Sequence, residues 1–395
     1  MPTTTPFREA VTNCPEVVLA AVGGATLVCG TRPELIKLAP LVRLFGDEGT
    51  IVYTGQHYDE SLYERIRAHL PPSNRFHELG VGGGRRGDQL GRTISAVDEV
   101  LATHPGRVVL VQGDTTSALA GALAANAHGL PLVHVEAGLR SHDRAMPEEH
   151  NRVLIDHLAD LCCAPTELNR RNLLAENVPA ERIAVTGNTV VEALEAALPP
   201  AAERAAVLAA RRLVRDRYVL ATIHRPENVD DPDRLAVILG ELARLPLPVV
   251  FPLHPRTAKS VDRFGLGRLL EPLDVTEPQA YPDFLALAAE TALIVSDSGG
   301  IQEEASVLKR PVVVVRRSTE RPEIAGTFGV LVPAGPSIGA EAARWLDDVA
   351  GHRERLRGLP SPYGDGSASA RIVAALGHLS GGPGGEAPGP GRSPG

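Results

Sequence analysis

The most informative segment of the chain reads Ser296-Asp297-Ser298-Gly299-Gly300-Ile301-Gln302-Glu303-Glu304-Ala305. It follows the apolar run 292–295, which predicts a buried strand, and it leads into a predicted helix. Asp297 and Ser298 are candidate N-cap residues, and Gly299-Gly300 allows a ligand to approach the backbone closely. The N–H groups and the positive dipole end of that helix attract an anion. Glu304 follows one turn later, where it could accept hydrogen bonds from ribose hydroxyls. We interpret the segment as a cradle for a nucleotide diphosphate; the alternative is an ordinary, well-capped strand-to-helix turn.

On both sides of this segment, short apolar runs alternate with helical patterns such as 116–128 and 233–245. Alternation of this kind predicts right-handed βαβ units and parallel sheets, which is an α/β fold. The predicted strands are 26–29, 51–54, 108–111, 132–135, 183–186, 218–223, 249–253, 292–295, 311–315 and 329–332.

The length and composition predict two domains. A chain of 395 residues with 43% apolar residues can fill two cores of ordinary size. The stretch 191–215 is rich in Ala, Glu and Arg and has no strand pattern, so we expect one sheet to end before it and another to begin after it. We predict two doubly wound, Rossmann-like domains at 18–188 and 189–365, with 366–380 packing back on the first. Residues 1–17 are predicted to be a flexible leader and the Gly- and Pro-rich residues 381–395 a disordered tail.

The bulk properties argue against several classes of partner. The formal net charge is −8 and there is no basic tract, so a nucleic-acid partner is not expected. The four cysteines form no C-x-x-C, which favours a reduced, cytoplasmic setting without a zinc site or disulfides. No run reaches the roughly 18 apolar residues of a membrane span. No P-loop motif occurs, and no Tyr is followed four residues later by Lys, so a nicotinamide cofactor is not predicted. His150 and His157 could share a helix face, but a metal site there would need further ligands, so no metal is predicted.

Polar motifs that contain glycine, histidine or acidic residues follow the predicted strands in both halves of the chain. In open α/β sheets, ligands bind outside the carboxyl ends of the strands. Two such sheets would therefore present these motifs to one cleft between the domains. The motifs are Gly30-Thr31-Arg32-Pro33-Glu34, Thr54-Gly55-Gln56-His57, Gly113-Asp114-Thr115-Thr116 and 134–140 in the first half, and 224–228, His254-Pro255, 297–300 and 319–323 in the second.

Within these motifs we single out acids, a histidine and several cations. Asp114, Glu136, Glu148 and Glu149 would raise one another's pKa near an anionic substrate, a cost expected where an acid and a base are needed together. The alternative is that each serves only as a helix cap or first-turn residue. His224 could supply a proton or positive charge to a leaving phosphate, unless it is a structural histidine. The candidate phosphate-binding cations are Arg32, Lys37, Arg140, Arg225 and Arg321.

Taken together, these motifs resemble those of the non-hydrolysing UDP-N-acetylglucosamine 2-epimerase family, from about residue 26 to residue 379. The resemblance implies two Rossmann-like domains in the GT-B arrangement, a UDP-sugar in the interdomain cleft, a homodimer and no NAD. The matching segments are Gly30-Thr31-Arg32-Pro33-Glu34 with 36–40, Thr54-Gly55-Gln56-His57, Gly113-Asp114-Thr115, 134–140, 147–152, Thr186-Gly187-Asn188-Thr189, His224-Arg225, 297–305 and 319–323.

The reaction implied by the resemblance is inversion at C2 of UDP-GlcNAc to give UDP-ManNAc. UDP is eliminated to leave a 2-acetamidoglucal and is then added back, with protonation from the opposite face. By resemblance, Asp114, Glu136, Glu148 and His224 match catalytic positions. The positions that match nucleotide and diphosphate contacts are Arg32, Lys37, Ser298, Gly299, Gly300, Glu304 and Arg321.

The segment Gln56-His57-Tyr58-Asp59 departs from the family pattern. Many bacterial members continue Gln-His with Arg and Gln in a regulatory site for a second UDP-GlcNAc, so Gln56 is only a candidate regulatory residue. The same segment resembles relatives that act on UDP-2,3-diacetamido sugars, which is one alternative substrate class. A hydrolysing epimerase is another alternative, although Pro33-Glu34 after Gly-Thr-Arg argues against it. A GT-B glycosyltransferase is a third, and it would leave C2 untouched.

Overall fold

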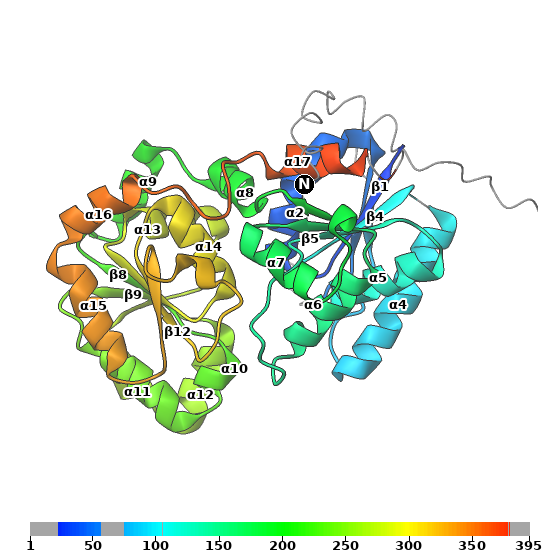
Figure 1. The fold of residues 1–395 in the computed structure, drawn as a ribbon. Coiled ribbons are helices and arrows are strands. Elements are labelled where there is room, and N and C mark those ends of the chain that lie inside the picture. The colour runs from blue at the N-terminus through cyan, green and yellow to red at the C-terminus, as the bar shows by residue number, and fades with distance from the viewer. Residues whose placement is uncertain (1–22, 57–74, 105, 378, 380–395) are drawn as a thin grey trace, which may run out of the picture.

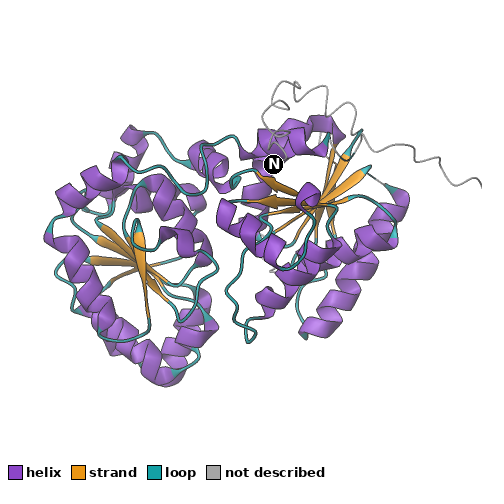
Figure 2. Ribbon diagram, in the orientation of Figure 1, coloured by secondary structure: helices purple, strands orange, loops and turns teal. Residues whose placement is uncertain are grey.

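The computed structural model describes residues 23–56, 75–104, 106–377 and 379. They form two α/β domains, each with a parallel sheet between layers of helices (Figures 1 and 2). The predicted fold class is therefore confirmed. The leader at 1–17 and the tail at 381–395 lie outside the described residues.

The first sheet has seven parallel strands in the order β3-β2-β1-β4-β5-β6-β7. The strand order reverses between β1 and β4. The strands are β1 (Ala25–Cys29), β2 (Gly49–Tyr53), β3 (Arg75–Glu78), β4 (Val108–Gln112), β5 (Leu132–Val135), β6 (Leu161–Ala164) and β7 (Ile183–Val185). The helices around them are α2 (Arg32–Phe45), α4 (Arg86–Thr103), α5 (Thr116–Ala127), α6 (Pro147–Leu158) and α7 (Glu167–Ala175).

The second sheet has six parallel strands in the order β10-β9-β8-β11-β12-β13, with the reversal between β8 and β11. The strands are β8 (Val219–Thr222), β9 (Val249–Pro252), β10 (Asp274–Thr276), β11 (Leu293–Ser296), β12 (Val312–Val315) and β13 (Gly329–Val332). The helices are α10 (Pro226–Val229), α11 (Pro232–Ala243), α12 (Pro255–Phe264), α13 (Tyr281–Glu290), α14 (Gly299–Leu308), α15 (Ser337–Asp347) and α16 (Val349–Arg357).

The apolar strands are buried on both faces because helices cover both sides of each sheet. In β4, Val108 and Leu110 pack into one core and Val109 and Val111 into the core on the opposite face. In β12, alternate valines divide in the same way between the two cores of the second domain. Continuous runs of Val, Leu and Ile are what such doubly covered parallel strands require.

Three strands were missed by the sequence analysis: β3, β6 and β10. β3 reads Arg-Phe-His-Glu and β10 reads Asp-Val-Thr, and both are polar edge strands that are partly exposed. β6 is buried but reads Leu-Cys-Cys-Ala, which has little of the β-branched character of a typical strand. The missed strands are therefore those whose composition differs from the apolar runs used to find the others.

The chain passes between the two domains twice, and the two crossings lie side by side. The first joins β7 to α8 (Val190–Ala197), which is followed by α9 (Ala201–Ala210), so no strand lies in 191–215. The second leads from α16 to α17 (Ala368–Leu376), which packs on α2 in the first domain (Figure 1). The backbone N–H of Asn188 donates to the carbonyl of Tyr363 over 2.8 Å. We propose that the domain boundary lies here, near residue 188.

Among the described residues, every helix is too short or too polar to span a lipid bilayer.

Candidate active site

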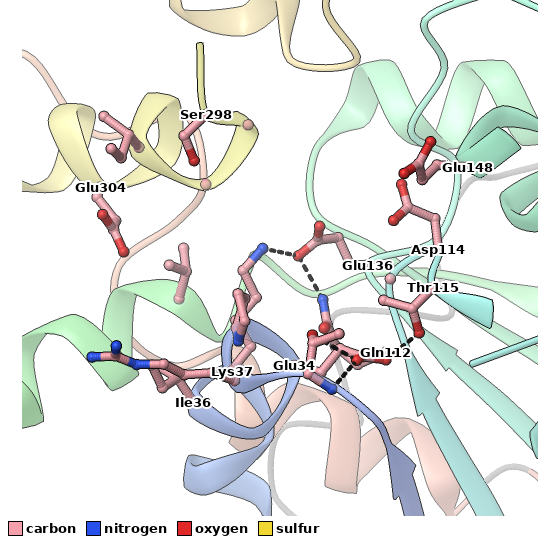
Figure 3. A pocket seen from close by; sticks show the side chains of 18 of the residues that line it. Glu34, Ile36, Lys37, Gln112, Asp114, Thr115, Glu136, Glu148, Ser298 and Glu304 are labelled. Carbon is pink, nitrogen blue, oxygen red and sulfur yellow. Dashed lines mark hydrogen bonds and ion pairs between the residues drawn. The ribbon is translucent and has the colours of Figure 1, made fainter. Parts of the chain in front are cut away.

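A cavity of about 460 Å³ lies between the carboxyl edges of the two sheets. It is flanked by the segments that follow β1 and β4 in one domain and β8 and β11 in the other, which are the four strands at the two reversals of strand order. Ligands bind at such reversals in doubly wound sheets. The candidate catalytic and substrate-binding residues line it, with the exceptions of Glu149 and Arg140. Those that line it are Arg32, Lys37, Asp114, Glu136, Glu148, His224, Arg225, Ser298, Gly299, Gly300, Glu304 and Arg321. Figure 3 shows Ser298 and Glu304 on one side, and Asp114 and Glu148 on the other.

The N-terminus of α14 opens onto this cavity. Ser298 is its N-cap residue, and the side chain of Ser298 makes no cap hydrogen bond. The backbone N–H of Ser298 itself donates to the hydroxyl of Ser296 over 3.0 Å. Asp297 is not the cap that the sequence suggested. Its buried carboxylate instead accepts hydrogen bonds from the backbone N–H groups of His224 and Arg225, at 2.9–3.0 Å, and from the amide of Asn228 at 3.0 Å. Asp297 therefore fixes the loop after β8 against α14, while the helix N-terminus itself remains available for an anion.

Gly299 is required by the close packing of two charged side chains. A Cβ atom at this position would lie 2.7 Å from Oε1 of Glu320 and 2.8 Å from Nη1 of Arg321. Both distances are shorter than a carbon atom tolerates. Since Glu320 and Arg321 are buried and paired with each other, neither can move away without breaking a charged contact. The glycine therefore allows the helix N-terminus and the Glu320–Arg321 pair to line the same wall.

We expect Gly299→Ala to weaken UDP binding by about ten- to a hundredfold, because overpacking of a filled site costs roughly 1–3 kcal/mol. Isothermal titration with UDP measures the effect. The matched control is Gly240→Ala in α11, where the new Cβ would meet its nearest neighbour, Arg244, at 3.9 Å. Equal UDP affinity in the two variants would contradict this account of the wall.

Glu136 directly follows β5, and its side chain lines the cavity. Its backbone has a φ of +71°, a left-handed conformation that is uncommon outside glycine and is often found at functional sites. Oε2 accepts hydrogen bonds from Lys37 at 2.5 Å, Gln112 at 2.9 Å and Asn188 at 3.0 Å. Oε1 accepts from Arg321 at 2.9 Å (Figure 3 shows the Lys37 and Gln112 contacts). Burial alone would raise the pKa of Glu136, but Lys37 and Arg321 hold it below its ordinary value.

Glu303 completes a buried network of charges across the domain interface, and the sequence analysis did not identify it as a site residue. Lys37 lies 2.7 Å from its Oε2 and the Nε of Arg321 lies 2.7 Å from its Oε1. The two cations that hold Glu136 thus also hold Glu303. Burial, together with the charge of Glu136, raises the pKa of Glu303 above its ordinary value. The segment 296–305 contained Glu303, but only the tertiary structure places its side chain beside Lys37.

The other acids divide into two groups. Asp114 accepts from the Nε of Arg152 at 3.1 Å, and its carboxylate and that of Glu148 lie near each other at the cavity wall (Figure 3). Glu149 faces away from the cavity and binds the backbone N–H groups of Ser141 and His142 at 3.0 and 2.8 Å. Glu149 also pairs with Arg152 at 2.5 Å. Its role is therefore to hold the loop before α6 and the arginine that orients Asp114.

His224 follows β8, on the same side of the cavity as the α14 N-terminus. Its Nδ1 lies 3.3 Å from Oδ1 of Asp297. Burial lowers the pKa of His224, and Arg225 acts in the same direction, while Asp297 opposes them. The neutral imidazole is therefore favoured at neutral pH, and such a ring can donate a hydrogen bond from one nitrogen and accept one at the other.

The sequence analysis predicted Arg140 as a phosphate-binding cation, but Arg140 does not line the cavity. Its guanidinium is buried and lies 2.7 Å from Asp156 and 2.5 Å from Glu176. Asp156 in turn lies 2.6 Å from Nδ1 of His134. Arg140 is thus held in a structural ion network under α6 and α7.

Gln56 also lies outside the cavity lining, and its Oε1 accepts from the backbone N–H and hydroxyl of Ser117 at 3.2 and 3.0 Å. The rest of its segment, His57 to Asp59, is outside the described residues.

Glu34 lines the cavity and caps α2. Its Oε2 accepts from the N–H groups of Gly30 and Thr31, at 3.1 and 2.8 Å, and from the hydroxyl of Thr31. Its Oε1 accepts from the hydroxyl of Thr115 at 2.6 Å. Burial raises the pKa of Glu34 from 4.5 to about 7, against the effect of these hydrogen bonds.

This shift predicts that Glu34 makes the folded protein less stable as pH rises from about 4.5 to about 7. In that interval the unfolded chain releases the proton that the folded protein retains. The loss amounts to about 3 kcal/mol in the free energy of unfolding. We therefore expect Glu34→Gln to gain about this much relative to the native chain between pH 4.5 and 7.5, measured by urea unfolding. Glu203→Gln, on the exposed face of α9, controls for the loss of a charge. A stability difference that does not change with pH would contradict the assignment.

Comparison with known proteins places these features in context. Residues 46–377 match the family model described as UDP-N-acetylglucosamine 2-epimerase. The UDP-N-acetylglucosamine 2-epimerase of Methanocaldococcus jannaschii is 38% identical over 363 residues, which cover 89% of this chain and 98% of that protein. The UDP-2,3-diacetamido-2,3-dideoxy-D-glucuronate 2-epimerase of Pseudomonas aeruginosa is 36% identical over 364 residues, covering 89% and 99%.

Two solved structures share the architecture. The Methanocaldococcus jannaschii UDP-GlcNAc 2-epimerase in complex with UDP-GlcNAc and UDP matches with a TM-score of 0.79 and 38% identity, over 90% of this chain and 99% of that chain. The Neisseria meningitidis UDP-GlcNAc 2-epimerase bound to UDP-GlcNAc matches with a TM-score of 0.80 and 33% identity, over 89% and 99%.

Proposed function

Because this chain belongs to the UDP-N-acetylglucosamine 2-epimerase family, we propose that it interconverts UDP-GlcNAc and UDP-ManNAc without hydrolysis. The observation that carries the proposal is the division of the cavity. One wall holds an uncapped helix N-terminus with arginines beside it, and the other holds the carboxylates of Asp114, Glu136 and Glu148. A diphosphate fits the first wall by charge, and a hexose attached to it would then face the acids.

The chemistry must solve one problem, which is that the proton at C2 is not acidic because no carbonyl adjoins it. Elimination avoids this problem. A carboxylate takes the C2 proton, the C2–H electron pair forms the C1=C2 bond, and the C1–O electron pair leaves with UDP. The resulting 2-acetamidoglucal then accepts UDP again at C1, while an acid protonates C2 from the opposite face. Two carboxyl groups on opposite faces of the ring are sufficient for the forward and reverse directions.

Residues that line the cavity can carry out each of these steps. Glu136 is the carboxylate that Lys37 and Arg321 keep ionised, which is the form that a base for the C2 proton must have. Asp114 and Glu148 provide the second acid and stabilise positive charge that develops on the ring. His224 and the N-terminus of α14 stabilise the departing diphosphate. Glu304 holds the ribose in this proposal, which is supported by its position in the cavity lining, where its carboxylate accepts from the hydroxyl of Tyr281 at 2.9 Å.

Incubation of the protein with UDP-GlcNAc in D2O tests the proposal. Proton NMR follows the reaction. We expect a mixture of UDP-GlcNAc and UDP-ManNAc, with one deuterium at C2 of each sugar nucleotide. Free ManNAc with stoichiometric UDP would assign the hydrolysing reaction instead. UDP-GlcNAc that keeps its protium at C2 after long incubation would exclude an epimerase.

A second substrate class is favoured by one observation, the 36% identity to the Pseudomonas aeruginosa diacetamido-glucuronate epimerase over 89% of the chain. We therefore propose that a UDP-2,3-diacetamido sugar be assayed beside UDP-GlcNAc. The ratio of kcat/KM for the two substrates identifies the natural one, because discrimination between substrates is a difference in transition-state binding.

We also propose that the protein is a cytoplasmic homodimer, as the family resemblance implies. Light scattering coupled to gel filtration measures the oligomeric state.

A further inference from the structure

The second domain contains another cavity, of about 380 Å³, that shares no lining residue with the active site. Its walls come from the C-terminal parts of α8, α13 and α14, together with α9 and α16. We propose that this cavity, which we call the arginine cavity, binds a small phosphate-bearing polyanion. The proposal goes beyond the epimerase reaction and does not depend on it.

The first argument is the excess of positive charge. The cations that line the cavity are Arg204, Arg215, Lys309, Arg310, Arg353 and Arg357, whereas its lining carboxylates are only Glu195 and Glu290. This excess is local, because the whole chain carries a formal net charge of −8. A concave surface with one sign of charge concentrates ions of the opposite sign.

The second argument is that four of the arginines share two carboxylates. Glu290 lies 2.8 Å from Nε of Arg204 and 2.7 Å from Nε of Arg215. Asp216 lies 2.6 Å from Nη1 of Arg310 and also pairs with Arg353. Each carboxylate is therefore divided between two guanidinium groups, and the cluster retains surplus positive charge. Of the remaining cations, Arg357 lies 3.4 Å from the exposed Glu354, and Lys309 donates to the carbonyl of Leu359 at 2.7 Å.

The third argument concerns Arg310, which lines the cavity although it is only 3% exposed. Its Nε is buried and has no hydrogen-bond partner within the described part of the chain. Burial lowers the pKa of Arg310 and also that of Arg353, and neighbouring arginines act in the same direction on both. The Nη atoms of Arg310 already donate to Asp216 and to the carbonyls of Thr291 and Ala289, so the contribution of this buried guanidinium to the cavity is its positive charge.

The chemistry of the ligand follows from the donors. Guanidinium groups offer planar pairs of N–H donors that match phosphate oxygens, and several of them converge here on one cavity. A ligand with two or more phosphate groups would satisfy more of them than a single carboxylate could. The volume is sufficient for a diphosphate with or without a nucleoside. The charges are gathered in a cavity and not along a stripe, which favours a small molecule over a nucleic acid.

Inorganic pyrophosphate is the probe that we would use, in equilibrium dialysis at constant ionic strength. No UDP is added, because UDP is itself a nucleoside diphosphate and would compete for the arginine cavity as well as for the active site. We expect the native protein to bind one equivalent of pyrophosphate more than the double variant Arg353→Gln/Arg357→Gln. The double variant should bind that equivalent at least tenfold more weakly. Arg344→Gln on α15 is the control, because this arginine is 75% exposed and lies outside the cavity.

Arg357→Gln alone guards against loss of folding, because its side chain is 54% exposed. We expect it to weaken binding by about threefold with an unchanged urea midpoint. ADP is then used to displace the equivalent of pyrophosphate that the double variant lacks. Displacement by ADP at lower concentrations than by pyrophosphate itself would identify a nucleotide as the ligand, and the opposite order would identify an inorganic phosphate. The proposal is overturned if the double variant binds as many equivalents of pyrophosphate, and as tightly, as the native protein.

Discussion

Glu136→Gln is expected to reduce kcat by about a thousandfold, within the range of 10²–10⁴ that a positioned acid or base contributes. Glutamine has the same shape as glutamate but cannot accept the C2 proton. The geometry sharpens the expectation, because all four groups that contact the carboxylate of Glu136 are donors, from Lys37, Gln112, Asn188 and Arg321. An amide must turn its own N–H₂ group toward at least one of them, so the side chain also loses its orientation.

The measurement is steady-state kcat with UDP-GlcNAc, together with titration of UDP to show that the variant still folds and binds. Asp114→Asn and Glu148→Gln should lose most of their activity as well, because they line the same wall. Glu241→Gln is the matched control, since Glu241 is similarly buried but contacts Gly339 and Arg244 in the second domain, away from the cavity. Turnover in the three variants close to that of the control would refute the assignment of the acids.

Arg321→Gln is expected to lower the free energy of unfolding by about 3–5 kcal/mol, the cost of removing one partner from a buried ion pair. Arg321 contacts Glu136 at 2.9 Å and Glu303 at 2.7 Å, and it also pairs with Glu320. Its loss would leave Lys37 as the only cation that pairs with Glu136 and Glu303 among the described residues. Two like charges in a buried site would then repel each other, and UDP binding should weaken because Arg321 also lines the cavity.

Urea unfolding measures the loss, and a double-mutant cycle with Glu303→Gln shows its origin. If repulsion between uncompensated carboxylates is the cause, the double variant should be more stable than Arg321→Gln alone. Arg344→Gln serves as the control, because exposed ion pairs contribute only about 0–1 kcal/mol. A loss in Arg321→Gln no larger than in this control, or no recovery in the double variant, would show that the network is not needed for stability.

The sequence was sufficient for those features that depend on the order of strands and the positions of their ends. Motifs after β1, β4, β5, β8 and β11 converge because parallel strands all end at the same edge, so Asp114, His224 and Ser298 could be brought to one cavity without a structure. The polar edge strands β3 and β10 were missed because they are only half-buried and lack apolar runs.

Side-chain partners were harder to predict, because they depend on tertiary distances. Arg140 and Arg321 both follow a strand-end motif, yet one pairs with Asp156 and Glu176 under two helices and the other reaches Glu136 across the domain interface. Glu303 and Glu304 are neighbours in α14, but only Glu304 lines the cavity. Helix geometry places adjacent residues about 100° apart, and without the packed structure nothing tells which of the two faces the ligand.

The hydrogen bond between Asn188 and Tyr363 has a mechanical consequence. Both connections between the halves meet at this place, where Gly187 has a φ of +85° and a Cβ atom would lie only 3.1 Å from the carbonyl oxygen of Tyr363. A separation of the halves that keeps this hydrogen bond must rotate about it, and the part of the cavity furthest from it then moves most.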